Sequence, residues 1–500
     1  MALVAAADWR SGLEFDPSPG RPRCEPALCG AFAYKAILVR MMPLGKQRLF
    51  SLHSKGLHID GPMQKPIEPP PKVIYAFQIL SKFPDGNVAN PKANGSPLPS
   101  EALRIVGLMC LAETLGMTGF AAYPAFLALL RDTWAISNSE AGFIGGAYFA
   151  GYMTAVPFLS ALTDRIDARR IYIGSCLLAA VSNLCFAFLS QGVFTAALFQ
   201  AMAGAGLGGT YMPGLKALTD RVTGPRQSRY ISFYTATFGV GTSLSLLLAG
   251  WLGRMVSWHS AFGLLAAGPL IAGCIIFLGL QPLPPPCSGT ARPGLLRSFS
   301  VLRNRTVLGY VLRYAVHCFE LFGLRSWMVA FILFAYGLSR SGHPLLGATE
   351  AAALINFLGI PISILGNETA MRLGRTRYIP WAMMASGVLA WVAGFSSAWP
   401  WWLMLLLLAL YFIAIMSDSA ALTAGLVEVT ALNARGAAMA VYSFGGFGAG
   451  FLAPLVFGAV LDVAGGKTDP SAWGLAFGSL GIGCLIASII ARLKSNSRQV

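Results

Sequence analysis

The stretch Tyr310–Tyr336, YVLRYAVHCFELFGLRSWMVAFILFAY, is apolar for long enough to cross a lipid bilayer, yet it carries Arg313, His317, Glu320 and Arg325. A charge at mid-bilayer costs about 2.5–3.5 kcal/mol on insertion scales unless it faces protein or water. At about 100° per residue, the four side chains fall within an arc of roughly 140° on one helix face. We therefore expect this face to look into the interior of a helix bundle.

The composition places the whole chain in a membrane. Of 500 residues, 55% are hydrophobic and 12% charged, and the mean hydropathy is +0.61. Apolar runs of about 20 residues recur from Arg104 to the C-terminus, which indicates an all-α membrane protein with many spans. The net charge of +16 comes from basic residues between the apolar runs. This arrangement is typical of membrane orientation, so we expect a lipid bilayer and no nucleic acid as partner.

The pattern predicts about twelve spans in two sets of six, separated by a Pro-rich linker at residues 282–306. The boundaries divide the chain into an extension at 1–103, a first half at 104–281, a second half at 307–492 and a tail at 493–500. The expected spans are 105–130, 138–162, 170–190, 193–216, 230–252 and 259–281, followed by 307–335, 347–370, 378–397, 399–427, 437–462 and 472–492.

The first 103 residues differ from the rest because they are rich in Pro, Gly, Lys and Arg. Such a segment cannot bury enough apolar surface to fold, so we predict disorder. One hypothesis is that the segment is partly or wholly a mis-called start. The alternative is a cytoplasmic regulatory tail.

The connections after even-numbered spans carry most of the basic residues, including Arg165, Arg221, Arg303, Arg372 and Arg435. By the positive-inside rule, these connections and both termini are cytoplasmic. The expected location is the inner membrane of the cell, as a multi-pass protein.

The two halves repeat one another. Similar segments lie 207 residues apart: ETLGM at Glu113 matches ELFGL at Glu320, and Arg165 and Arg170 match Arg372 and Arg377. Several matches in one register indicate a duplicated six-helix unit. We therefore expect Glu113 and Glu320 to face each other across the two halves.

The connection between the second and third spans reads SALTDRIDARR, and its weaker second copy reads MRLGRTR. With the duplicated architecture, these motifs resemble the Major Facilitator Superfamily of secondary transporters, in a bacterial type of branch. Ser160 stands where that family usually has glycine. The resemblance implies that these connections gate the cytoplasmic side through charge contacts; ordinary positive-inside anchoring is the alternative. The expected gating residues are Asp164, Arg165, Arg169, Arg170, Arg372 and Arg375.

The resemblance also implies a central cavity lined by spans 1, 4, 7 and 10. Most ionisable residues placed deep in the spans fall on these four. A carboxyl group in a dry cavity is less stable when charged, and a nearby arginine reverses that effect. Because alternating access changes the surroundings, such groups can load and release protons. The candidates for proton coupling are Glu113, Glu320, Asp418 and His317. The alternatives are static ion pairs, such as Glu320 with Arg325, or direct binding of a cation.

The candidate substrate-binding residues are Arg325, His317, Glu113, Tyr211 and Gln200. Arginine can hold a carboxylate with two hydrogen bonds, which favours a small organic anion moved together with protons. Efflux of amphipathic compounds is the alternative. Against it, the Gly-Pro pair of antiporters in this superfamily is absent from span 5, and Gln200 replaces the usual arginine of span 4.

Other classes of function are less well supported. A membrane sensor on a transporter-like fold would account for the long N-terminal extension. No pattern indicates an enzyme, a cofactor or a metal site. We expect the protein to act as a monomer.

Overall fold

The computed structural model describes residues 99–224, 226–283, 299–339, 342–431 and 434–496. The predictions for most of the N-terminal extension, for the linker over 284–298 and for residues 497–500 lie outside the described residues.

The described residues form helices and no strand. Ten helical segments among them are long and apolar enough to cross a membrane, which confirms the all-α membrane class. Two further predicted spans correspond to α2 with α3, and to α13. The helices are α2 (Pro99–Gly116), α3 (Ala122–Thr133), α4 (Asn138–Leu162), α5 (Ala168–Leu189), α6 (Val193–Arg221), α7 (Gln227–Met255), α8 (Trp258–Leu265), α9 (Ala267–Gly279), the 3-10 helix η2 (Phe299–Arg303), α11 (Arg305–Leu338), α12 (Ala348–Leu373), α13 (Arg375–Gly394), α14 (Trp401–Val429), α15 (Arg435–Val463) and α16 (Pro470–Asn496).

Local capping fixes where several spans begin. Ser137 and Glu140 form a capping box at the start of α4. Asp167 accepts a hydrogen bond from the backbone N–H of Arg169 at the start of α5. Asn304 accepts one from Thr306 before α11. Each cap satisfies backbone donors that the first helical turn leaves free.

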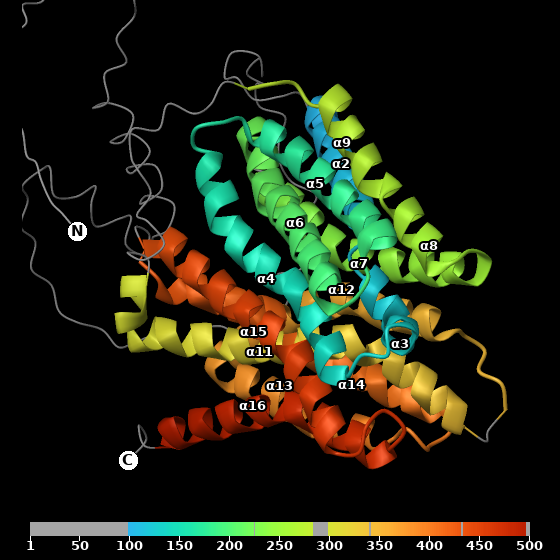
Figure 1. The fold of residues 1–500 in the computed structure, drawn as a ribbon. Coiled ribbons are helices and arrows are strands. Elements are labelled where there is room, and N and C mark those ends of the chain that lie inside the picture. Colours follow the sequence, from blue (N-terminus) through green and yellow to red (C-terminus); the bar gives the residue numbers. More distant parts are fainter. Residues whose placement is uncertain (1–98, 225, 284–298, 340–341, 432–433, 497–500) are drawn as a thin grey trace, which may run out of the picture. The chain divides into compact units, whose positions relative to one another are not determined.

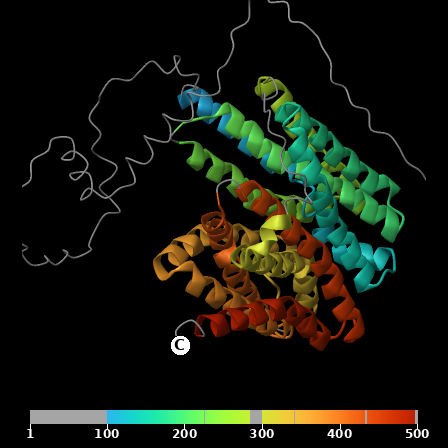
Figure 2. The same ribbon diagram turned by 90° about the vertical axis from the view of Figure 1, so that its left-hand side faces the viewer.

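The helices pack as two groups of six spans, α2–α9 and α11–α16 (Figures 1 and 2). The principal contacts between the groups join α4 to α15 and α7 to α12. We call the end with the α3–α4, α7–α8 and α15–α16 connections the odd end, because these follow odd-numbered spans. The other end is the even end.

Glycines allow α4 and α15 to approach closely. A Cβ atom on Gly142 would overlap with the carbonyl group of Pro454, and one on Gly458 with the carbonyl group of Asn138. Inside a bilayer the hydrophobic effect does not drive helices together, so van der Waals contact between closely packed helices stabilises the pair instead. The glycines near Gly204 also serve packing, since a Cβ there would overlap with the backbone of Tyr148.

The prediction of a continuous first span is wrong, because the helix is broken between α2 and α3. The side chain of Ser245 repairs the break: its Oγ accepts from the N–H of Ala121 (2.9 Å) and donates to the carbonyl of Thr118 (2.6 Å). The Thr118 hydroxyl in turn donates to the carbonyl of Leu265 (2.9 Å), where α8 ends and α9 begins. The two breaks therefore meet inside the first half, where the side chains of Ser245 and Thr118 satisfy backbone groups that the breaks leave free.

Candidate functional site

A cavity lies between the two halves, and six spans contribute to its wall. Spans 1, 4 and 7 line it as expected, together with spans 2, 5 and 8, whereas span 10, which was also expected to line the cavity, contributes no residue to this wall. The lining residues are Phe120, Ala121, Tyr123, Pro124, Gly145, Tyr148, Phe149, Gln200, Thr242, Leu246, Arg325, Ser326 and Asn356. The wall is mostly aromatic and aliphatic with a few polar groups, the chemistry of typical small-molecule sites. In this conformation its open space is only about 20 Å³, room for about one or two water molecules, so an organic solute can enter only if the halves move apart.

Arg325 is the charged residue of this wall. Its Nε donates to Oδ1 of Asn356 on α12 (2.9 Å). Its guanidinium lies over the rings of Phe238 (5.8 Å) and Phe412 (5.7 Å), which come from different halves. Among the described residues no carboxylate lies within ion-pair distance of Arg325. Only the Nε–H is used in the hydrogen bond to Asn356. The other four of the five N–H donors lie between aromatic rings and remain available to an anion.

The alternative of a static Glu320–Arg325 ion pair is wrong, because the two side chains bond to different helices. Asn356 was missed at the sequence level. An asparagine within the apolar run ALINFLGI was the available signal, since a buried amide requires a partner. Of the predicted substrate-binding residues, Arg325 and Gln200 line the cavity together.

His317 and Asp418 form a separate pair between α11 and α14. His317 Nδ1 lies 2.7 Å from Asp418 Oδ1, and both side chains are buried. The ring of Tyr314 stacks on His317 on one side and on Tyr442 on the other, with centroids 6.0 and 3.6 Å apart. These two predicted residues do meet, but within the second half and outside the cavity wall.

Glu113 is fully buried inside the first half. Its Oε2 accepts hydrogen bonds from Tyr172 on α5 (3.1 Å) and Tyr234 on α7 (3.0 Å), while Oε1 has no partner among the described residues. Tyr211, also predicted to bind substrate, stacks against Tyr234 with centroids 6.0 Å apart. Neither Glu113 nor Tyr211 belongs to the cavity wall.

Glu320 has a matching position in the second half. Its Oε2 accepts from Ser386 on α13 (2.8 Å) and from the thiol of Cys484 on α16 (3.0 Å). The prediction that Glu113 and Glu320 face each other across the halves is therefore wrong. Each carboxyl group points into its own half, where polar side chains of neighbouring spans replace water.

The four charges of Tyr310–Tyr336 consequently have different surroundings. Glu320 faces α13 and α16, His317 faces α14, and Arg325 faces the cavity. The guanidinium of Arg313 lies 6.0 Å from the centroid of the Tyr310 ring. An arc of 140° is wide enough to contact several neighbours, so one helix face does not imply one site.

The comparisons with known proteins agree with this architecture. The model of the Major Facilitator Superfamily matches residues 109–383, more than half of the chain. The chain belongs to the Major Facilitator Superfamily.

Two characterised relatives are similar to parts of this superfamily member. A gentisate transporter of Corynebacterium glutamicum is 30% identical over 165 residues, which are 32% of this chain and 36% of that protein. The efflux pump azaK of Aspergillus niger is 27% identical over 261 residues, 48% of this chain and 54% of that pump. The matches thus span about a third to a half of these relatives.

A solved structure matches over a greater length. A bacterial homologue of the human lysosomal transporter Spinster, in an inward-facing and occupied conformation, has a TM-score of 0.66 at 15% identity. The match covers 80% of this chain and 98% of that one. This likeness supports the superfamily fold.

At the even end, a residue beside the predicted gating set makes the principal contacts. Asp167 pairs with Arg221 at the end of α6 (3.2 Å) and accepts from the backbone N–H of Leu283 (2.9 Å). Burial alone would raise the pKa of Asp167, but the N–H groups of Leu283 and Arg169 together with the Arg221 guanidinium lower it below the usual value. The contact joins the start of α5, the end of α6 and the first residues of the linker.

The predicted gating residues surround this cluster and its second copy. Arg169 donates to the carbonyl of Phe277 (2.5 Å), and Arg375 pairs with Glu428 on α14. Asp164 and Arg165 lie in the α4–α5 connection, Arg170 in the first turn of α5, and Arg372 in the last turn of α12. None of these contacts of Asp167, Arg169 and Arg375 joins one half to the other, so a role for them in gating remains a prediction.

At the odd end, polar contacts cross from one half to the other. Both carboxylate oxygens of Asp462 on α15 accept hydrogen bonds from Asn138 and Ser139 at the start of α4, at 2.6–3.1 Å. A carboxylate at a helix N-terminus is favoured by the free N–H groups and the helix dipole. Asp132 also pairs with Lys467, and Arg254 with Glu350. We call these three contacts the odd-end clasp.

Proposed function

We propose that this protein is a secondary active transporter that moves a small organic anion by alternating access, in symport with protons. The observation that carries the proposal is Arg325: a cation in the cavity between the halves, without a carboxylate partner among the described residues. A planar carboxylate could take two parallel hydrogen bonds from such a guanidinium. The aromatic rings of Phe120, Tyr148 and Phe149 would cover an apolar substrate body.

The gentisate transporter of Corynebacterium glutamicum supports the same substrate class, since gentisate is an aromatic carboxylate. Gln200 lines the same cavity as Arg325 and offers a neutral hydrogen-bonding partner for hydroxyl or carbonyl groups. Efflux of amphipathic compounds is the second candidate, favoured by the similarity to the efflux pump azaK.

Proton coupling is supported by three buried carboxyl groups outside the cavity wall. Glu113 and Glu320 bond only to hydroxyl and thiol groups among the described residues, and Asp418 Oδ1 lies within ion-pair distance of His317. In an apolar bundle, a carboxyl group with no cation beside it has a lower free energy as the neutral acid than as the charged carboxylate. Movement of the halves that admits water or a cation would release the proton.

We further propose that the odd end faces outward and that both termini are cytoplasmic, because the even connections carry the excess of Arg and Lys. Under this orientation the odd-end clasp closes the outer side of the cavity. The similarity to bacterial transporters supports the inner membrane as location.

The test uses purified protein in liposomes, with radiolabelled gentisate as probe and an imposed pH gradient. We expect gradient-driven uptake that Arg325→Gln lowers at least tenfold, equivalent to about 1.4 kcal/mol. Arg325→Lys should retain part of the uptake. Asn356→Asp should also block uptake, because a fixed carboxylate would occupy Arg325. Exposed Arg104→Gln is the matched control.

Uptake of gentisate that is unaffected by Arg325→Gln would contradict the anion site. Export of hydrophobic cations with no uptake of gentisate, benzoate or small dicarboxylates would favour the efflux candidate. Uptake that is insensitive to the pH gradient would refute proton symport while leaving the anion site intact.

A further inference from the structure

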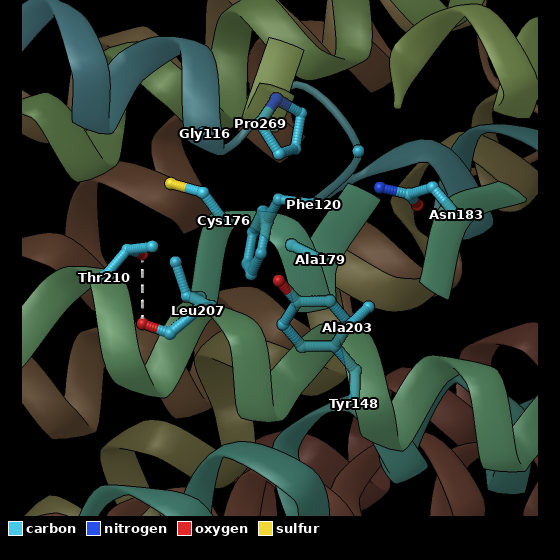
Figure 3. Close-up of a pocket in the computed structure, with 11 residues that line it drawn as sticks. Gly116, Phe120, Tyr148, Cys176, Ala179, Asn183, Ala203, Leu207, Thr210 and Pro269 are labelled. Atoms are coloured by element: carbon cyan, nitrogen blue, oxygen red, sulfur yellow. Dashed lines mark hydrogen bonds between the residues drawn. The ribbon is translucent and has the colours of Figure 1, made fainter. Parts of the chain in front are cut away.

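A second cavity lies inside the first half, where the two helix breaks meet (Figure 3). Gly116 and Gly119 line it beside the break in span 1, and Pro269 lines it beside the break in span 6. The remaining lining residues are Phe120, Tyr148, Cys176, Ala179, Asn183, Ala203, Leu207 and Thr210. The open space corresponds to about one water molecule, which is too small for an organic solute.

The Asn183 amide points into this cavity from α5 (Figure 3). The residue is 5% exposed, and none of the described residues forms a hydrogen bond with its side chain. The hydroxyl of Tyr148, which also lines the cavity, likewise has no hydrogen-bond partner among them. Buried amides and hydroxyls are costly without hydrogen bonds, so two such groups on one small cavity point to a bound water.

Asn183 is not required for packing in the duplicated fold. The residue 207 positions later is Ala390, which is fully buried in the same span of the second half. Gly119 provides the room for the amide, because a Cβ on Gly119 would lie 2.5 Å from Asn183 Nδ2. The first half thus maintains a polar group and the space for it where the second half has a methyl group.

The cavity lies between Glu113 and the central cavity. On one side Thr210 lines it; the Thr210 hydroxyl donates to the carbonyl of Leu207 (3.2 Å) and also lies beside the Glu113 carboxyl group. On the other side, Phe120 and Tyr148 line both this cavity and the one that holds Arg325. Oε1 of Glu113 has no partner among the described residues.

The titratable groups that face Glu113 are phenols and thiols from the helices packed around it. They are Cys110, Tyr148, Tyr152, Tyr172, Cys176, Tyr211 and Tyr234. None of these groups is a cation. Binding and release of a proton by Glu113 therefore depend on whether water reaches the carboxyl group, because no neighbouring cation displaces the proton.

We propose that the Asn183 cavity binds a water molecule and that this water forms part of a proton-transfer path, the water branch, between the central cavity and Glu113. The Asn183 amide and the Tyr148 hydroxyl hold the water. A proton from the central cavity passes to this water, and the Thr210 hydroxyl relays it to Oε1 of Glu113. It leaves by the same route in reverse. The inference rests on the proposed proton coupling, but the water site can be tested without any substrate.

The test follows the infrared C=O stretch of protonated Glu113 in the full-length protein at mildly acid pH, after transfer to D₂O. Loss of the band in Glu113→Gln assigns it. We expect the band of the wild-type protein to shift to its deuterated position as fast as the solvent is exchanged. Asn183→Leu, which fills the cavity with an apolar group, should slow the shift at least tenfold. Asn183→Ala, which leaves room for water, should remain fast.

If Asn183→Leu does not fold, Gly119→Ala serves as the second variant, since its methyl group displaces the amide. Exchange of the wild-type band as slow as that of buried backbone amides would overturn the proposal. The same holds if Asn183→Leu exchanges as fast as the wild type, or if no Glu113 band appears. A fast band together with uptake that is independent of pH would refute proton symport and leave the water branch standing.

Discussion

Glu113, Glu320 and Arg325 are stabilised by neutral neighbours rather than by opposite charges, unlike Asp418, which pairs with His317. Glu113 accepts hydrogen bonds from two phenol hydroxyls, and Glu320 accepts them from a serine hydroxyl and a thiol. Arg325 donates a hydrogen bond to an amide oxygen and lies over two aromatic rings. Neutral partners stabilise a charge less firmly than a buried ion pair, whose loss costs about 3–5 kcal/mol. Such groups can change protonation or bind an ion without breaking a salt bridge.

Glu320→Gln should abolish accumulation of gentisate against a gradient while sparing exchange of labelled for unlabelled gentisate. The amide keeps the size of the side chain and can still accept from Ser386, but it cannot carry a proton. Flux driven by a pH gradient and counterflow, measured in the same liposomes, distinguish the two activities. The exposed Glu101→Gln is the control. Undiminished accumulation in Glu320→Gln would remove Glu320 from proton coupling.

At the scale of elements, the ends of α5 and α13 show how the duplication diverged. Asp167 caps α5 and pairs with Arg221 at the end of α6, whereas Gly374 precedes α13 and Arg375 pairs with Glu428 at the end of α14. Arg221 and Glu428 lie 207 residues apart, in the register of the repeat. The charge is thus reversed at this shared position, while the partner lies one position further along, since Gly374 corresponds to Asp167 and Arg375 corresponds to Ala168.

Asp167→Asn should lower the thermal stability of the first half at neutral pH. Asparagine is as good an N-cap as aspartate, so the variant isolates the charge, and we expect a loss of about 1–2 kcal/mol. Because the folded state lowers the pKa of Asp167, this stability is present above the unfolded pKa of about 4 and is lost as the pH falls through the folded pKa.

Thermal unfolding in detergent between neutral and acid pH measures this difference. The gap between wild type and Asp167→Asn should shrink as the pH falls below about 4. Asp220→Asn removes a surface pair with Lys216 within one helix and should have a small effect, about 0.3–0.5 kcal/mol. A gap that stays constant over the whole pH range would show that the carboxylate charge does not stabilise this end.

At the scale of the whole membrane domain, the odd end combines close backbone packing with polar contacts between the halves. Gly142 and Gly458 bring α4 and α15 together, and Asp462 covers the start of α4. All three belong to the α4–α15 contact, so one substitution there acts on the separation of the halves.

Gly458→Leu should hold the odd end open, because its side chain would overlap with the backbone of Asn138. Hydrogen–deuterium exchange read by mass spectrometry should become faster in residues 137–146 and 454–463. Gly436→Leu is the control on the same helix, since a Cβ there meets nothing within 4 Å. Equal exchange in the two variants would show that α4 and α15 do not need this contact to close the odd end.

The sequence alone determined the class of fold, the number and approximate bounds of the spans, and the duplication. These features depend on apolar run length and on register, which are local properties of the chain. It also placed Arg325 and Gln200 together, and both line the cavity between the halves. For helices that lie next to a central cavity, a polar side chain in an apolar run indicates a residue that faces the cavity or the bundle interior.

Only the tertiary structure decided what each buried charge faces. Arg325 looks into the cavity while Glu320, five residues earlier on the same helix, bonds to α13 and α16. It also revealed the break at Met117–Ala121, which Ser245 from a distant span makes possible. Helical periodicity gives the direction of a side chain about its own axis, but the neighbour found in that direction depends on how all the spans pack.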